Sequence, residues 1–356
     1  MSTSDHDWWD PHSEQPYALP EAQKPRAAAG NVNEYLRVLF TALGLAPAIA
    51  WRYLHRRRGA LRPAADSFIG LSVSPSPGHG AAVTEMVEEL GAQKLLIRVP
   101  SWDEKEMENR ARFAESFRGR ELLINILQNR HSVLDKKHWR RAVEKTFTAF
   151  APSASNFQIG NAINRSKWGC RHSGDYLDLM EIAHREKKKF PGIRLFGTSV
   201  IDFEPLVILR TLVNRRRYRQ HGCALQMYVD RRGAPERRQF GVFNLHNKLR
   251  LAAALLALSN RSEKKLWVTE TNWPLRGTEP YTPTSACPTV SEETQAQYLT
   301  RYYQIAHRSG FVERVYWWQL INPGYGLVDH RGGALRKMPS YHAFKNLRAS
   351  LQDGAR

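Results

Sequence analysis

Lys265-Leu266-Trp267-Val268-Thr269-Glu270 is the stretch of sequence that decides the fold. It is a short run of mostly β-forming residues, it ends on a carboxylate, and segments with helical patterns lie on both sides of it, at residues 245–258 and 292–309. Strands that alternate with helices in this way are typical of parallel βα units. The sequence on both sides repeats the same arrangement.

Eight β-rich runs follow one another from residue 67 onward, with helical patterns between them. The runs cover residues 68–73, 94–99, 121–128, 156–161, 193–203, 224–230, 265–270 and 313–320, and the clearest helices cover 81–90, 139–150, 174–189, 245–258 and 292–309. An open doubly wound sheet is the competing fold, but the turn after the first run lacks the G-x-G-x-x-G spacing of such sheets. We therefore expect an α/β fold, a single (β/α)₈ TIM barrel over residues 67–350.

An N-terminal extension precedes the expected barrel. Residues 1–30 show no period and indicate a flexible tail, and no secretory signal is visible in them, which favours a cytoplasmic location. Residues 31–66 predict a helical extension, in which the uncharged run 38–51 is too short to span a bilayer and contains Pro47. Two interpretations stay open: a helix packed on the barrel, or an interfacial helix whose residues 35–58 contact the inner face of the membrane.

The chain carries a formal net charge of +19, which favours polyanionic partners such as anionic lipid or acidic glycans. Nucleic acid is disfavoured as a partner because no recognition module is visible. The three cysteines form no C-x-x-C pair, and neither a metal site nor a cofactor-binding motif is expected.

The carboxyl ends of barrel strands are where catalytic side chains gather, so we searched those ends for chemistry. They offer carboxylates, amides and aromatic rings, the groups that hydrogen-bond and stack on sugars. Glu270 closes the seventh run, on the same face as Leu266 and Val268 by strand alternation. Our candidates for substrate binding are Arg98, Asn125, Asn161, Asn164, Trp168, Tyr228, Trp318 and Gln319.

Four of these segments together resemble a known superfamily. Residues 267–273 (Trp-Val-Thr-Glu-Thr-Asn-Trp) resemble the seventh-strand nucleophile motif of the (β/α)₈ glycoside hydrolases often called clan A. Residues 97–100, 157–161 and 316–319 resemble its second-strand arginine, fourth-strand Asn-Glu and eighth-strand tryptophan segments, in the expected order. The resemblance covers about residues 67–347 and implies a retaining glycosidase or transglycosidase.

The resemblance also implies roles for individual residues. Glu270 would attack the anomeric carbon, while Arg98 and Tyr228 would orient it and keep it charged. Asn161 would bond a sugar hydroxyl, and Trp318 would form a platform under the sugar ring.

One position departs from the family pattern. The general acid/base glutamate that follows the fourth-strand Asn is replaced here by Ala162. A retaining enzyme needs two carboxyl groups about 5 Å apart, so a substitute acid would have to come from Asp202 or Glu204 on the neighbouring strand. Two functions therefore stay open: a glycosidase on an anionic or envelope-associated glycan with a relocated acid, or a membrane-associated protein that binds carbohydrate without cleaving it.

Overall fold

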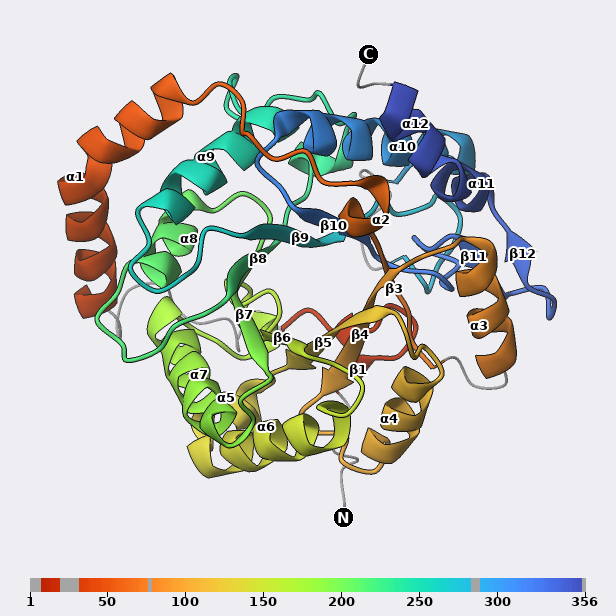
Figure 1. The fold of residues 1–356 in the computed structure, drawn as a ribbon, viewed down its shortest axis with the longest axis horizontal. Coiled ribbons are helices and arrows are strands. Elements are labelled where there is room, and N and C mark those ends of the chain that lie inside the picture. Colours follow the sequence, from red (N-terminus) through yellow and green to blue (C-terminus); the bar gives the residue numbers. More distant parts are fainter. Residues whose placement is uncertain (1–7, 20–31, 76–78, 283–288, 354–356) are drawn as a thin grey trace.

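The computed structural model describes residues 8–19, 32–75, 79–282 and 289–353. Eight parallel strands close into a barrel in the order β10-β3-β4-β5-β6-β7-β8-β9, which confirms the expected TIM barrel (Figure 1). The barrel strands are β3 (Ile69–Ser72), β4 (Lys94–Pro100), β5 (Glu121–Leu127), β6 (Asn156–Ile159), β7 (Arg194–Ile201), β8 (Gly222–Gln226), β9 (Leu266–Thr271) and β10 (Arg314–Trp317). Each lies within one of the eight predicted runs, allowing one or two residues at the ends.

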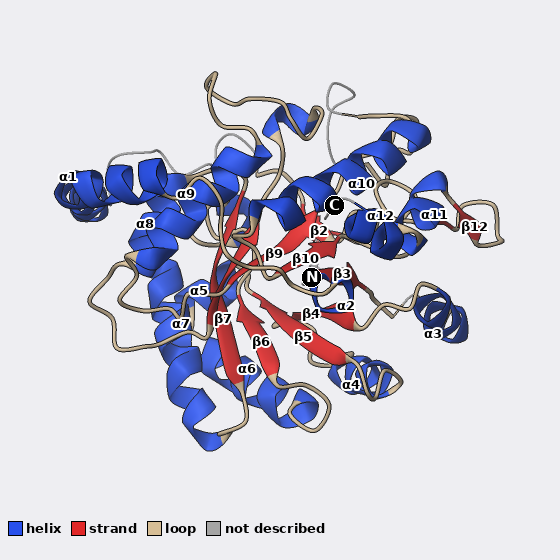
Figure 2. Cartoon of the chain, turned by 45° about the horizontal axis from the view of Figure 1, so that its top comes forward, coloured by secondary structure: helices blue, strands red, loops and turns tan. Residues whose placement is uncertain are grey.

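Helices surround the barrel on its outside, as Figure 2 shows. They are α1 (Val32–His55), α2 (Ala65–Phe68), α3 (Gly80–Glu89), α4 (Met107–Glu115), α5 (Arg130–Leu134), α6 (Lys136–Phe150), α7 (Ser173–Glu186), α8 (Pro205–Leu212), α9 (Leu245–Ala257), α10 (Glu292–Ser309), α11 (Pro339–Lys345) and α12 (Leu347–Asp353). The short helices α2, α4, α5, α8, α11 and α12 were not predicted from the sequence. Two two-stranded ribbons complete the fold, β1 (Trp9–Asp10) with β2 (Gln15–Pro16) and β11 (Val328–Asp329) with β12 (Arg336–Lys337).

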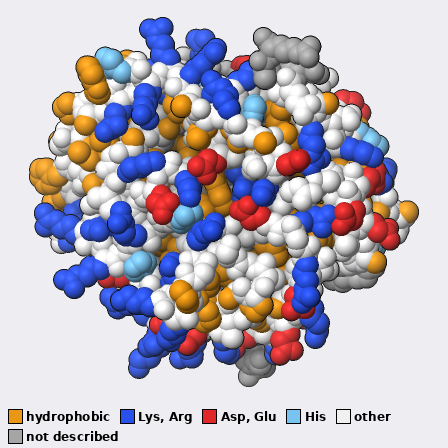
Figure 3. Space-filling view, viewed as in Figure 1, with side chains coloured by type: hydrophobic (Ala, Val, Ile, Leu, Met, Phe, Trp, Pro, Cys, Tyr) orange, Lys and Arg blue, Asp and Glu red, His pale blue; other side chains and the backbone are white. Residues whose placement is uncertain are grey.

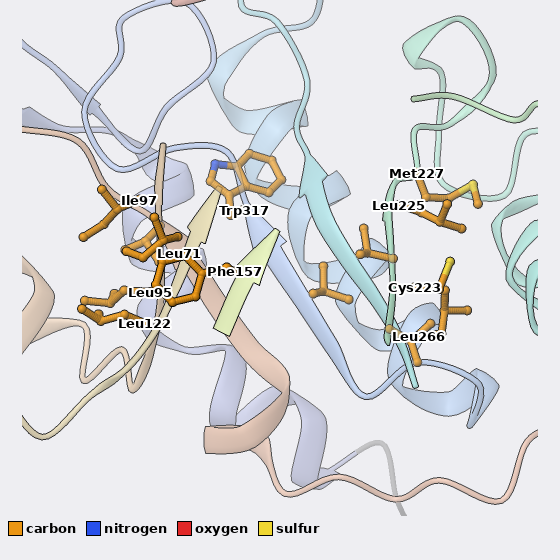
Figure 4. Packing of buried hydrophobic residues seen from close by; sticks show 14 of the residues in the cluster. Leu71, Leu95, Ile97, Leu122, Phe157, Cys223, Leu225, Met227, Leu266 and Trp317 are labelled. Carbon is orange, nitrogen blue, oxygen red and sulfur yellow. The ribbon is translucent and has the colours of Figure 1, made fainter. Parts of the chain in front are cut away.

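The core has two layers because successive side chains of a strand point to opposite faces. Leu95, Ile97 and Leu225 belong to the large cluster between strands and helices, part of which is drawn in Figure 4. Leu96 and Trp267 belong to a second buried cluster inside the barrel. Apolar side chains thus lie on both faces of strands such as β4, as is common in a parallel sheet covered on both sides.

An ion pair lies where β5 and β10 begin. Arg314 Nη1 lies 2.7 Å from Oε1 of Glu121, and the Arg314 guanidinium lies 4.3 Å from the centre of the Trp267 ring. Burial alone would raise the pKa of Glu121, but the hydrogen bond and charge of Arg314, with those of Lys94, lower it to about 2. The charges are at the amino ends of the strands, so they stabilise the face of the barrel opposite to the carboxyl ends.

The predicted N-terminal extension divides into two described parts. Residues 8–19 contain the β1–β2 hairpin, while residues 1–7 and 20–30, the rest of the expected tail, lie outside the described ranges. Helix α1 packs against α8 and α9 on the outside of the barrel (Figure 1). No helix in the described part of the chain is long and apolar enough to cross a membrane.

Candidate active site

Glu270 lies near the carboxyl end of β9, only 7% exposed, with three hydrogen-bond donors on its carboxylate. Arg98 Nη2 from β4 and Gln226 Nε2 from β8 both donate to Oε2, the latter at 3.1 Å. The Tyr228 hydroxyl, just beyond β8, donates to Oε1. Three donors from β4 and the end of β8 thus hold one buried carboxylate of β9 in a fixed orientation.

Two cations stack on the aromatic rings around Glu270. The Arg98 guanidinium lies 3.3 Å from the centre of the Trp318 ring, and that of Arg232 lies 3.2 Å from the centre of the Tyr228 ring. Burial and the nearby charge of Glu270 raise the pKa of the Tyr228 hydroxyl well above its ordinary value. Tyr228 therefore stays protonated and can serve as a donor throughout the physiological range.

The position of the family's acid/base glutamate is filled by backbone and apolar contacts. Ala162 is fully buried beside Leu127 and Trp168, and its amide nitrogen donates to Oε1 of Gln226 at 2.9 Å. The neighbouring Asn161 accepts a hydrogen bond from Asn125 Nδ2 at 3.1 Å. Asn125 and Asn161, which were both predicted to bind substrate, thus contact each other, and position 162 beside them carries no carboxyl group.

The two predicted substitute acids lie elsewhere. Asp202 and Glu204 both form ion pairs with Arg165, whose Nη2 is 2.7 Å from Oδ2 of Asp202. They line an adjacent, larger pocket of about 510 Å³ together with Lys248, and this pocket shares Tyr228 and Arg232 with the cavity around Glu270. Among the described residues, Glu270 contributes the one carboxyl group that lines the cavity around it.

The cavity above Glu270 is small, about 90 Å³. The described residues that line it are Ser13, Gln15, Arg98, Asn161, Trp168, Ile201, Tyr228, Arg232, Glu270, Asn272, Pro274, Trp318 and Tyr325. Sequence reasoning predicted six of these, and Ser13 and Gln15 come from the N-terminal hairpin. The hairpin therefore reduces the open space at the barrel mouth.

Side-chain contacts hold the hairpin at this mouth. The backbone oxygens of His12, Ser13 and Glu14 accept hydrogen bonds from Asn322, Tyr325 and Arg98 of the barrel, respectively. The ring of Trp9 also lies edge-on to two barrel tryptophans, with centroids 5.2 Å from Trp102 and 5.9 Å from Trp168. Both polar and aromatic contacts thus connect residues 9–16 to the barrel.

Lys167, in the loop after β6, is a partly buried cation at the same mouth. Its Nζ donates to Oε1 of Gln15 at 2.7 Å, and no described carboxylate lies within ion-pair distance. Burial lowers its pKa to about 8, although the charges of Glu270 and Asp10 act in the opposite direction. Arg232 also has no carboxylate partner among the described ion pairs, so two unpaired cations face this site.

Two predicted binding residues have other contacts in the structure. Asn164 bonds the backbone of Ile201 through both ends of its amide, at 2.8 and 2.9 Å, and so connects the loop after β6 to the end of β7. Gln319 donates to the Glu14 carboxylate of the hairpin at 3.0 Å. The sequence analysis missed Gln226, although it lies two residues before Tyr228 and alternation places both on one face.

No protein-family model and no curated protein sequence matches the chain. Solved structures resemble it in fold. A family 39 glycoside hydrolase from the gut symbiont Bacteroides cellulosilyticus WH2 aligns with a TM-score of 0.58 and 16% identity, over 81% of this chain and 65% of that one. The chain thus spans slightly less than two thirds of that structure.

A family 1 β-glucosidase from Thermotoga maritima aligns with a TM-score of 0.57 and 10% identity, over 82% of this chain and 99% of that one. An arabinofuranosidase aligns with a TM-score of 0.58 and 14% identity, over 80% and 70%. At such low identities these alignments concern the fold and not the chemistry. The chain shares the (β/α)₈ fold of the clan A type glycoside hydrolases.

Proposed function

We propose that this protein binds a glycan at the carboxyl ends of its barrel strands and that Glu270 is the nucleophile that attacks it. The observation that carries the proposal is the convergence of Arg98, Gln226 and Tyr228 on a single buried carboxylate. A carboxylate is costly to bury, and the three donors offset part of this cost for Glu270. The carboxylate lines a cavity together with the indoles of Trp168 and Trp318. Apolar sugar faces stack on such rings.

The missing acid restricts the chemistry. In a retaining reaction, a Glu270 oxygen would bond to the anomeric carbon as the bond to the leaving oxygen breaks, giving a glycosyl ester. With alanine at position 162, no carboxyl group protonates that oxygen. The leaving group would therefore have to depart as a stable anion, and a water or sugar hydroxyl would then attack the ester slowly without a base.

The charges around the site favour an anionic glycan or leaving group. Lys167 and Arg232 have no carboxylate partners among the described ion pairs, and the chain as a whole carries +19. Buried or half-buried cations are normally paired, so an anion bound between them would relieve their desolvation. An acidic or phosphorylated glycan has this chemistry.

The hairpin has to move for such a ligand to enter. The cavity of about 90 Å³ is well below the roughly 300 Å³ at which ligand pockets begin. Residues 9–16 supply two of its lining residues, Ser13 and Gln15, and are attached to the barrel through contacts with side chains. We propose that displacement of this hairpin opens the glycan site.

A second candidate function is glycan binding without turnover. The ion pairs of Asp202 and Glu204 with Arg165 favour it over a glycosidase with a relocated acid, and neither carboxylate lines the cavity around Glu270. Such a protein would use the same aromatic and amide groups, with Glu270 as a hydrogen-bond acceptor for sugar hydroxyls.

The two functions differ in whether a covalent bond forms. A panel of 2-fluoro glycosides with dinitrophenolate leaving groups would be incubated with the full chain and its mass measured. The nucleophile proposal expects one glycosyl adduct, located on the peptide that contains Glu270 and lost in Glu270→Gln. Glu263→Gln, at an exposed carboxylate, is the matched control. Binding of glycans without any adduct would instead support the second function.

A further inference from the structure

Helix α1 is fixed to the barrel by one of its faces. Ala42, Leu45 and Ile49 pack against the core cluster on the side of α8 and α9. Near the start of the helix, Nε of Arg210 lies 3.0 Å from Oε2 of Glu34, and near its end Arg250 donates to the Leu54 carbonyl at 3.0 Å. The helix is therefore held at both ends and presents a defined opposite face.

That opposite face is apolar along the whole helix. Its large exposed side chains are Val32 (59%), Tyr35 (56%), Leu36 (41%), Leu39 (50%), Phe40 (67%), Leu43 (62%), Trp51 (64%) and Leu54 (62%). Steps of three and four residues place them on one stripe, which Ala46, Pro47 and Ala50 continue across the middle. From residue 32 to 54 the stripe is about 33 Å long at 1.5 Å per residue. An exposed apolar surface of this length indicates a binding partner.

Basic residues gather at the carboxyl end of this stripe. Arg56, Arg57 and Arg58 follow the helix and are all exposed. Arg250 adds a further cation at this end, with its guanidinium 4.2 Å from the centre of the Tyr53 ring. Glu34 is the one carboxylate in residues 32–58, and Arg37 and Arg210 both bond to it. The charge that the stripe presents to a partner is therefore positive.

We infer that the outer face of α1 docks on the surface of an anionic lipid bilayer, with the helix lying parallel to it. Large apolar side chains beside a basic cluster are the composition of interfacial helices, whose apolar face enters the headgroup layer by about 5–10 Å. The helix lies at the outer edge of the barrel, and hydrophobic side chains are visible along this edge of the molecule in Figure 3. A fluid headgroup layer can cover such a convex ridge without a matching groove.

A second copy of the chain is a less suitable occupant of this face. Each copy carries +19, so two copies repel one another over their whole surfaces. An anionic headgroup layer removes this penalty, because Arg56–Arg58 would lie next to negative charge. The sequence left a packed helix and an interfacial helix as alternatives, and the two faces of α1 allow one helix to be both.

Vesicle flotation of the full chain tests the inference. We expect the protein to float with phosphatidylcholine vesicles that contain phosphatidylglycerol and to bind at least tenfold less to phosphatidylcholine alone. Leu43→Ser/Leu54→Ser should reduce flotation at least tenfold. Leu134→Ser is the matched control, since Leu134 on α5 is 65% exposed against 62% for Leu43, and it should change nothing.

Two further measurements separate the alternatives. Arg56→Gln/Arg57→Gln/Arg58→Gln should abolish the preference for anionic vesicles. Lys187→Gln/Lys188→Gln/Lys189→Gln, in the basic run that directly follows α7, should preserve it. Brominated lipid should quench the fluorescence of Trp51, and this quenching should be lost in Trp51→Phe. The inference is overturned if the chain fails to float, or if Leu134→Ser weakens flotation equally. It is also overturned if sedimentation velocity shows a dimer in lipid-free solution that Leu43→Ser/Leu54→Ser dissociates.

Discussion

The side chain of Gln226 connects the backbone of Ala162 to the carboxylate of Glu270. Its Oε1 accepts from the Ala162 amide at 2.9 Å, and its Nε2 donates to Glu270 at 3.1 Å. One amide thus joins the vacated acid position to the proposed nucleophile, in a place where water is excluded. The site is a continuous polar network in which one carboxyl group is missing.

Ala162→Glu should restore part of the missing chemistry. A carboxyl group at this position could protonate a leaving oxygen, a contribution of about 10² to 10⁴ in rate. We expect cleavage of unactivated glycosides to rise at least tenfold, while turnover of glycosides with activated leaving groups stays within about twofold. Steady-state kinetics on both substrate classes would measure this.

The control for this variant is Ala162→Gln, which has nearly the same shape without an acid. Ala162 is fully buried with a φ of 44°, so a melting curve of each variant should accompany the kinetics. Equal rates for the Glu and Gln variants on unactivated glycosides would contradict the proposal that the acid is what the site lacks.

Arg98→Met should destabilise the protein by about 3 kcal/mol, because it leaves the Glu270 carboxylate buried without its cation. The side chains of the pair are 7% and 9% exposed. The double variant Arg98→Met/Glu270→Met should recover most of this loss, since no charge then remains buried. Urea unfolding at pH 7 would report both free energies of unfolding. A double variant less stable than the single one would show that the pair is not coupled in this way.

Strand order could be predicted from the sequence because it follows from periodicity, but the face on which Glu270 lies could not. Leu266 and Val268, expected on the same face as Glu270, belong to the cluster between strands and helices, whereas Glu270 faces the cavity at the barrel mouth. The β-rich runs recur along the chain with helices between them, and closure of the barrel then brings the carboxyl ends of the strands together. The hairpin could not be predicted in this way. Its contacts, such as Ser13 with Tyr325, join residues about 300 positions apart in the sequence and arise from loops without a period.

The ion pairs of Asp202 and Glu204 with Arg165 could not be predicted, for a related reason. Alternation along a strand assumes regular backbone, but Thr198, Ser199 and Asp202 all have positive φ, and the register between β7 and β8 shifts between Thr198 and Val200. The side chains beyond this irregularity turn toward Arg165. An acid at the expected sequence position therefore lies in a different pocket.

Lys167 should make stability rise with pH above neutrality. Its pKa is lowered from 10.5 to about 8 by burial, so between these values the native state holds fewer protons than the unfolded state. The free energy of unfolding then increases with pH across this window. Lys167→Met should raise stability at pH 7 and reduce the slope between about pH 8 and 10.5, as urea titrations at several pH values would show.

Part of the slope should remain in Lys167→Met, because burial also lowers the pKa of Lys248 to about 8. Lys137→Met, at an exposed lysine of α6, is the comparison outside the site and should keep the full slope. A slope unchanged in Lys167→Met would mean that this ammonium is solvated in the native state.

Trp9→Ala should increase the affinity of the protein for a glycan that enters the barrel mouth. The substitution removes two edge-on aromatic contacts, to Trp102 and Trp168, each worth about 0.5–1.5 kcal/mol. If the hairpin has to move for binding, only molecules with an open hairpin bind the glycan. The apparent affinity then equals the affinity of the open form multiplied by the fraction of molecules that is open. A loss of about 2 kcal/mol in hairpin closure would therefore tighten binding by up to about thirtyfold.

Calorimetric titration with the best glycan from an array would measure the change. Trp51→Ala, at an exposed indole of α1, should leave the affinity unaltered. A weaker affinity in Trp9→Ala would show instead that the hairpin forms a wall of the bound site, because the glycan would then need the ring that was removed.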